Sequence, residues 1–491
     1  MEKTDPMVFS SHLFLFYFLP LVLVLYFAAP RSCRHLALCL LSYAFYGWAN
    51  PSFMILMLVT TMIVYFCGLV IAKQSRATWK QPIERLETGG SRTRAQRIAL
   101  AMAVCANLSI LGFFKYFNFA TENYDALVAA LGFENLQLQT MMVVTLPLGL
   151  SFYTFQSMSY AIDVYRGDAT AVRNPIDFAC YVAMFPQLVA GPIIRFSEVD
   201  DQLRHRTHTL EKFTRGVAFI SLGLAKKVFL ANACGKVADI VFDAGAAGMA
   251  DSWVGALAYT FQIYFDFSAY SDMAIGLGLM LGFVFPKNFD SPYISASITE
   301  FWRRWHISLS SWLRDNLYIP LGGSRKGSLR TYVNLAVVML LGGLWHGAAW
   351  TFLIWGGIHG ALLAFERMMG KDSLYRNLPR FVRVTLTFVI VMFAWVFFRS
   401  ADLSSAVRYC AAMVGLGGST ETTGLIGGVI YQPYYIITVI TAAVVTWTCP
   451  QTWNFTRHLT WPKVMVILLA LVGSIIVLTA QEFNPFIYFI F

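Results

Sequence analysis

The chain has 491 residues, of which 57% are hydrophobic and only 13% are charged. Because soluble proteins carry roughly 25% charged residues, this composition excludes a soluble globular protein and indicates that lipid surrounds most of the chain. The formal net charge of +10 does not indicate nucleic-acid binding, since Lys and Arg gather in the cytoplasmic loops of membrane proteins. The eight cysteines have no paired spacing, so neither a disulfide framework nor a metal site is expected.

Apolar stretches long enough to cross a bilayer recur along the whole chain. A spanning helix needs about 20 mostly apolar residues, and the sequence predicts an all-α multi-pass membrane protein with about 11–12 such helices. No separate soluble domain is expected. The predicted spans are residues 8–30, 36–50, 52–72, 98–116, 140–162, 213–234, 252–274, 331–349, 350–366, 384–399, 430–449 and 463–481.

The charge of the loops predicts their orientation, because cytoplasmic loops are enriched in Lys and Arg. Loop 73–97 carries seven Lys and Arg against two Glu, and loop 367–383 is also basic, so both are expected on the cytoplasmic side. Loop 235–251 carries three Asp and one Lys and is expected outside. Continuing this alternation along the chain places both termini outside.

Two apolar segments do not fit simple spans. Segment 176–195 is broken by Pro186, Gly191 and Pro192, and irregular backbone at membrane depth requires a covering of protein or a water-filled cavity. A re-entrant element that lines a cavity is therefore expected. Segment 285–330 alternates tryptophans with arginines, which is typical of a helix at the cytoplasmic interface.

The run GGLWHGAAWTFLIWGGIHG at 342–360 places His346 deep in an apolar span and His359 on the next one. An ionisable residue inside a membrane helix is costly and is a candidate for function, and histidine suits proton transfer near neutral pH. The alternative is a structural histidine bonded to a backbone carbonyl. The functional interpretation is favoured for His346, whereas both interpretations stay open for His359.

The basic interfacial segment holds a second histidine, His306, beside Trp305 and three arginines, Arg303, Arg304 and Arg314. Guanidinium groups on the cytoplasmic side are expected to attract a donor that carries phosphates. The alternative is an aromatic and cationic belt at the level of the lipid headgroups. That belt would explain the tryptophan and the arginines but not the histidine.

The predicted span around residue 265 carries several polar side chains, which are Gln262, Asp266, Ser268, Tyr270, Ser271 and Asp272. Two acids in one membrane helix indicate a lined cavity that could bind substrate. They could also relay protons, which keeps a transporter among the alternatives. Lys226 and Lys227 on the preceding span are expected either to snorkel to the interface or to meet these acids.

Six colinear runs resemble one known family, the membrane-bound O-acyltransferases, and within it the members that acetylate bacterial alginate. The runs are MVFSSHLFLFYFLP (7–20), PLGLSFYTFQSMSYAIDVYRG (147–167), FPQLVAGPIIR (185–195), YTFQIYFDFSAYSDMAIGLGLMLGFVFPKNFDSPY (259–293), SITEFWRRWHISLSSWLRDNLYIPLGG (297–323) and LLGGLWHGAAWTFLIWGGIHG (340–360). The resemblance covers about residues 7–410, and 411–491 is similar mainly in apolar character. It implies one membrane-embedded domain over 1–491, ending in further transmembrane helices.

The resemblance also implies a central tunnel that opens to the cytoplasm and narrows near the family's functional histidine, which matches His346. A second functional position matches His306. The implied activity is the transfer of an acetyl group across the bacterial inner membrane. Acetyl-CoA is the expected donor and is a substrate, without a permanently bound cofactor.

The expected acceptor is a periplasmic acetyltransferase-like partner protein, which then modifies an exported polysaccharide such as alginate. Two alternatives stay open. The same chemistry could serve another polymer, by acetylating cellulose or by transferring D-alanine to a cell-wall polymer. A transporter of acyl or glycan groups is less favoured, because such proteins often contain two repeated halves and none is apparent.

Overall fold

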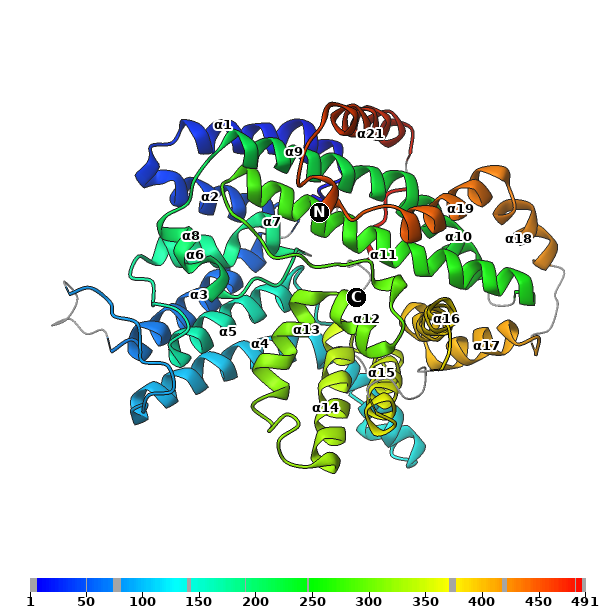
Figure 1. Ribbon diagram of the computed structural model, residues 1–491. Coiled ribbons are helices and arrows are strands. Elements are labelled where there is room, and N and C mark those ends of the chain that lie inside the picture. The colour runs from blue at the N-terminus through cyan, green and yellow to red at the C-terminus, as the bar shows by residue number, and fades with distance from the viewer. Residues whose placement is uncertain are drawn as a thin grey trace. The chain divides into compact units, whose positions relative to one another are not determined.

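The computed structural model describes residues 7–49, 51–73, 81–138, 143–189, 191–244, 247–370, 377–416, 422–481 and 483–487. Within these ranges the regular elements are helices and no strand occurs (Figure 1). The prediction of an all-α protein is confirmed. Parts of the predicted loops 73–97 and 367–383, and the first residues of the predicted span 140–162, lie outside the described residues.

Six helices are long and apolar enough to cross a membrane: α3 (Ser52–Ile71), α4 (Arg94–Ala130), the continuous helix Leu210–Asp243, α14 (Ser328–His346), α16 (Arg380–Arg399) and α21 (Trp461–Ala480). Two shorter apolar helices are Leu13–Ala28 and α19 (Pro433–Thr448). These helices coincide with predicted spans and confirm a multi-pass membrane protein. The other predicted spans coincide with α2 (Arg34–Gly47), α5 (Leu150–Arg166), α11 (Met249–Met280) and α15 (Trp350–Met368), and the total of about 11–12 stays a prediction.

The described residues group into two compact units. Unit 1 contains the chain up to Phe213 together with Gly278–Pro286, and unit 2 contains Thr214–Leu277 and Lys287–Phe491. The prediction that residues 1–491 form one domain stays a prediction.

Unit 1 is built mainly from η1 (Leu13–Phe18) and α1 to α8. Its elements not yet given are α1 (Leu19–Ala28), η2 (Arg31–Cys33), η3 (Glu134–Leu136), α6 (Pro175–Ala183), α7 (Phe185–Leu188) and α8 (Phe196–Arg204). The irregular segment 176–195 is confirmed, because α6 ends at Ala183 and Pro186 lies at the start of the four-residue helix α7. Protein covers it, since Val182, Phe185 and Leu188 are fully buried.

Unit 2 contains the histidine-rich segments. Its elements not yet given are α9 (Leu210–Ala225, which begins in unit 1), η4 (Lys226–Ala231), α10 (Asn232–Asp243), η5 (Pro292–Ile294), α12 (Ile298–Arg304), α13 (Ile307–Leu313), η6 (Arg314–Tyr318), α17 (Leu403–Met413), α18 (Thr422–Ile430) and α20 (Thr452–Phe455). Figure 1 shows α14 and α15 running side by side, with α12 and α13 near the His346 end of α14.

The basic segment 285–330 differs from the single interfacial helix that the sequence predicts. Trp305 is extended and His306 is left-handed, so the helix is interrupted between α12 and α13. A π-helical turn, η6, then begins at Arg314. Alternation of Trp and Arg does not reveal such breaks, because both residue types are compatible with helix.

Candidate active site

His346 is the last residue of α14, and the contact between α14 and α15 fixes its position. The two helices approach at glycines: a Cβ at Gly343 would lie 2.2 Å from the carbonyl oxygen of Phe352, and a Cβ at Gly356 would lie 2.3 Å from that of Met339. No side chain fits at such distances. These glycines therefore allow close packing of the two helices, which holds His346 against the start of α15.

Aromatic rings surround the His346 imidazole, which is only 6% exposed. The ring centroids of Trp345, Trp355 and Phe398 lie 5.0, 5.3 and 5.2 Å from that of His346, all in edge-on orientations. Such a site restricts the rotation of the imidazole and excludes most water from it.

His306 lies close to His346, with 6.3 Å between the two ring centroids. It is fully buried, and neither ring nitrogen has a hydrogen-bond partner within the described part of the chain. His306 lies outside the candidate spans, and burial lowers the pKa of its imidazole to about 3. The ring is therefore neutral at physiological pH.

The backbone at His306 adopts φ 43° and ψ 56°, a left-handed conformation that is uncommon for a residue other than glycine. Asn288 stabilises this turn, since its carbonyl oxygen accepts from the Ile307 N–H at 2.9 Å and its side-chain oxygen accepts from the Ser308 hydroxyl at 2.9 Å. Such strained backbone is concentrated at functional sites, and here it brings His306 near His346.

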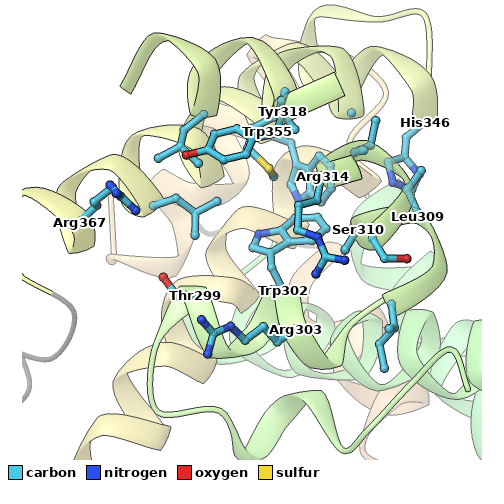
Figure 2. Close-up of a pocket in the computed structure, with 18 residues that line it drawn as sticks. Thr299, Trp302, Arg303, Leu309, Ser310, Arg314, Tyr318, His346, Trp355 and Arg367 are labelled. Atoms are coloured by element: carbon cyan, nitrogen blue, oxygen red, sulfur yellow. The ribbon is translucent and has the colours of Figure 1, made fainter. Parts of the chain in front are cut away.

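A cavity of about 440 Å³ lies beside His346 (Figure 2). One face of α14 lines it at helical spacing through Leu335, Val338, Met339, Gly342 and His346. At a rise of 1.5 Å per residue, the stretch from Leu335 to His346 is about 17 Å long, so the cavity is elongated. The predicted tunnel through the whole protein stays a prediction.

Three arginines line the same cavity: Arg303, Arg314 and Arg367. Arg303 and Arg367 are exposed, and Figure 2 shows Arg367 across the cavity from His346. The end lined by Arg303 and Arg367 is called the cavity mouth below. Arg314 is bound to Asp315, with contacts of 2.6 and 3.0 Å.

Arg304 and Trp305, which the sequence groups with these residues, lie elsewhere. The Arg304 guanidinium donates to Glu300 at 3.0 Å and to the carbonyl oxygen of Asp290 at 3.0 Å. Trp305 is buried, with its ring centroid 5.0 Å from that of Trp395. Both residues stabilise the turn around His306 without lining the cavity.

His359 is fully buried one helical turn beyond Trp355. Its Nδ1 accepts a hydrogen bond from the indole N–H of Trp302 at 3.2 Å. Trp302 and Trp355 both line the cavity, whereas His359 lies behind them. Since Nδ1 is an acceptor, the neutral imidazole carries its proton on Nε2.

The structure does not bring Asp266, Gln262 and Tyr270 to this cavity. Asp266 is 2.7 Å from the Lys227 ammonium and accepts from the backbone N–H of Ile487 at 2.9 Å. Tyr270 stacks on Phe486 at 4.4 Å between ring centroids. Gln262 packs instead against Gly235 of α10.

The second interpretation of the two lysines is the correct one, because both meet the acids. Lys226 and Lys227 are consecutive residues in the π-helical turn η4, where they pair with Asp272 at 2.6 Å and with Asp266. Lys227 also donates to the carbonyl oxygen of Pro485. The two acids of α11 thus bind lysines, and Asp266 and Tyr270 contact the segment 483–487, which lies far away in the sequence.

Sequence reasoning did not select Trp302, Trp355 or Arg367 as part of one cavity. Trp355, Leu363 and Arg367 lie on one face of α15 at multiples of four residues. Extending the helical pattern of His359 along α15 towards the next loop could have found these three residues, whereas no such pattern selects Trp302. Together, a buried imidazole and a basic cavity mouth can bind an anionic molecule and accept a proton from it or from a second substrate.

Comparison with known proteins agrees with this chemistry. The model of the membrane-bound O-acyltransferase family matches residues 170–401. A probable alginate O-acetylase of Pseudomonas putida is 46% identical over 506 residues, and one of Azotobacter vinelandii is 43% identical over 518; each alignment covers 99% of this chain and 100% of the relative. A peptidoglycan O-acetyltransferase of Helicobacter pylori is 36% identical over 447 residues, covering 84% of this chain and 80% of the relative.

Identity of this extent over almost the whole length does not arise by chance, and the matched region includes the arginine-lined cavity with His346 and, beside it, His306. The chain therefore belongs to the membrane-bound O-acyltransferase family and is a multi-pass membrane O-acyltransferase.

Proposed function

We propose that this protein transfers an acetyl group from acetyl-CoA, bound from the cytoplasmic side of the bacterial inner membrane, for O-acetylation of an exported polysaccharide such as alginate. One observation carries the proposal: His346 shares an elongated cavity with Arg303, Arg314 and Arg367. Relatives with matching length that are named probable alginate O-acetylases support the acetyl group and the polymer.

The cavity mouth suits the phosphates of the donor. Arg303 and Arg367 are exposed guanidinium groups, which bind phosphate through two parallel hydrogen bonds. Between the mouth and His346 the wall is apolar, with Leu335, Val338 and Met339 on α14. A donor with a charged head and a long, weakly polar arm fits a cavity with a basic mouth and an apolar wall. Its thioester then lies beside His346.

His346 acts as the general base in this mechanism. Its neutral imidazole accepts the proton of an acceptor hydroxyl while that oxygen attacks the thioester carbonyl carbon. The C–S bond then breaks, and the imidazolium returns the proton to the departing thiolate. General base catalysis contributes typically about 10²–10⁴-fold, and the fixed orientation of both reactants supplies the remainder.

His306 stays neutral because of its low pKa, so it is not a store for the proton. Its role in the proposal is to orient the reacting groups beside His346, which is 6.3 Å away between ring centroids.

The length of α14 supports transfer towards the opposite side of the membrane. The helix begins at Ser328 near Arg325, Lys326 and Arg330, and its 19 residues end at His346, so it is about 28 Å long. With the basic end on the cytoplasmic side, His346 lies at the end of α14 that is farther from the cytoplasm. The acceptor that reaches His346 from the opposite side is a periplasmic acetyltransferase-like partner, which passes the acetyl group to the polysaccharide.

The test is the ester content of the exported polysaccharide in cells that produce His346→Ala in place of the native protein. We expect acetyl esters to disappear at a normal level of membrane-inserted protein. His458→Ala is the matched control, because His458 is exposed and does not line the cavity, and it should leave the esters unchanged. Retained acetylation in His346→Ala would refute the role of His346.

The same cells distinguish the acceptor polymers. Loss of esters from cellulose, or of D-alanyl groups from a cell-wall polymer, with intact alginate acetylation would replace the proposed acceptor while keeping the cavity chemistry.

A further inference from the structure

Acyl transfer requires more than a base. When the acceptor oxygen attacks the thioester, the carbonyl oxygen becomes negatively charged, and a positioned hydrogen-bond donor must stabilise it. Removing one such donor typically lowers kcat by about 10²–10³-fold. His346 cannot fill this role while it accepts the proton of the acceptor, so a second group is required within reach of the same carbonyl.

Most donors that line the cavity already have an acceptor. The Trp302 indole donates to His359 at 3.2 Å, the Ser310 hydroxyl donates to the Trp305 carbonyl oxygen at 3.3 Å, and the Ser311 hydroxyl donates to that of Ser308 at 3.0 Å. The Thr299 hydroxyl donates to Glu366 at 2.7 Å, and Arg314 is bound to Asp315. Arg303 and Arg367 are exposed at the cavity mouth.

Trp355 is different. Its side chain is 1% exposed and lines the cavity, yet its indole N–H has no hydrogen-bond acceptor in the described portion of the chain. Leaving a buried donor unsatisfied costs about 1–3 kcal/mol. Such a cost in a well-packed site is explained most simply if the N–H serves a group that arrives with the substrate.

The indole is also held next to the proposed base. The Trp355 and His346 ring centroids are 5.3 Å apart, with an angle of 88° between the ring planes. Trp395 stacks on Trp355 at 5.6 Å and 19°, and Phe398 packs against its edge at 5.0 Å. These contacts fix the indole before the substrate binds, and a donor that needs no reorganisation is the effective kind.

We propose that Trp355 is a catalytic residue whose indole N–H donates a hydrogen bond to the acyl carbonyl oxygen as it gains negative charge. The acceptor oxygen forms a bond to the carbonyl carbon, and its proton moves to His346. The electron pair of the C=O bond moves to the oxygen that Trp355 binds. The pair then returns, the C–S bond breaks, and the thiolate takes the proton from His346.

This inference rests on the proposed role of His346 in acyl transfer. Trp355→Phe tests it in the full-length protein in lipid vesicles with acetyl-CoA, because phenylalanine keeps an aromatic ring but has no N–H. We expect kcat to fall by about 10²–10³-fold while the KM for the donor is unchanged. Trp253→Phe is the matched control: its indole N–H donates to the Met413 carbonyl oxygen at 2.9 Å, away from the cavity lining, and kcat should be unchanged.

A second variant separates the N–H from the packing of the ring. Replacement of Trp355 by 3-benzothienylalanine exchanges the N–H for sulfur in a ring system of nearly the same shape. This variant should therefore fold even if the Trp355→Phe variant does not. Native-like kcat in this variant, or a rise in KM alone, overturns the inference. Activity that survives His346→Ala but not the benzothienyl variant refutes the proposed base and leaves the donor role of Trp355 intact.

Discussion

Glu366 should stabilise the helix that carries the cavity mouth. Its carboxylate lies near the end of α15, is 5% exposed, and accepts three hydrogen bonds from the first turn of α12: from the N–H of Ile298 at 2.7 Å, the N–H of Thr299 at 2.9 Å and the hydroxyl of Thr299 at 2.7 Å. The first N–H groups of a helix have no partner inside the helix. Glu366 therefore caps α12 from another helix and fixes Arg303 at the far end of α12.

The loss of stability follows from the donors that each substitution leaves without an acceptor. Glu366→Ala leaves two backbone N–H groups without an acceptor, at about 1–3 kcal/mol each, so the free energy of unfolding should fall by about 2–6 kcal/mol. Glu366→Gln keeps one acceptor oxygen and should lose about 1–3 kcal/mol. Ser297→Ala removes the shorter-range cap, in which the Ser297 hydroxyl accepts from the Glu300 N–H at 3.0 Å, and should lose about 1 kcal/mol.

The assay is thermal unfolding of the purified protein in detergent, followed by tryptophan fluorescence, together with the KM for the donor. The unfolding midpoint should be lowest for Glu366→Ala, higher for Glu366→Gln and highest of the three for Ser297→Ala. The KM for the donor should rise in these variants because Arg303 and Thr299 both line the cavity. Glu211→Ala serves as the control, since Glu211 is an exposed residue in the first turn of α9. A midpoint and KM like those of the native protein in Glu366→Ala would show that α12 does not depend on this cap.

Three further predictions test other parts of the structure. Gly343→Ala should abolish activity, because its Cβ would lie 2.2 Å from a carbonyl oxygen, whereas Gly357→Ala should be tolerated, since the nearest atom is 3.6 Å away; equal activities would contradict this. Lys227→Met leaves Asp266 as an unpaired buried charge and should lower the free energy of unfolding by about 3–5 kcal/mol. The double variant with Asp266→Leu should lose less stability, and additive losses measured by thermal unfolding would refute the pairing. The His306 pKa of about 3 lies below its ordinary 6.5, so the unfolded chain binds this proton more readily between those values. Stability should therefore fall as the pH drops below about 6.5, by at most about 1.4 kcal/mol per pH unit, and His306→Asn should reduce that fall; an unchanged pH dependence would contradict it.

The class of the protein and the principal histidine were accessible from the sequence. Long apolar runs predict membrane helices for a direct physical reason, and an ionisable residue inside such a run is unusual enough to select His346. The run 342–360 has glycines in both halves, and Gly343 and Gly356 form the contact between α14 and α15.

Other features depend on contacts that no local pattern contains. Asp266 looked like part of a substrate cavity, but Lys227 and the distant segment 483–487 bind it. Arg304 looked equivalent to Arg303, yet the break at Trp305 and His306 directs Arg304 to Glu300 and Asp290. The sequence shows that a polar group is present, whereas tertiary structure decides which partner it finds.

The role of His346 as the base is tested most directly by the kinetics of acyl transfer by the purified protein in vesicles, with acetyl-CoA as donor. We predict that His346→Ala lowers kcat by about 10²–10⁴-fold with an unchanged KM for the donor. Arg303→Gln together with Arg367→Gln should raise this KM, because both arginines lie at the cavity mouth. A kcat for His346→Ala equal to that of the native protein would show that His346 is not the base.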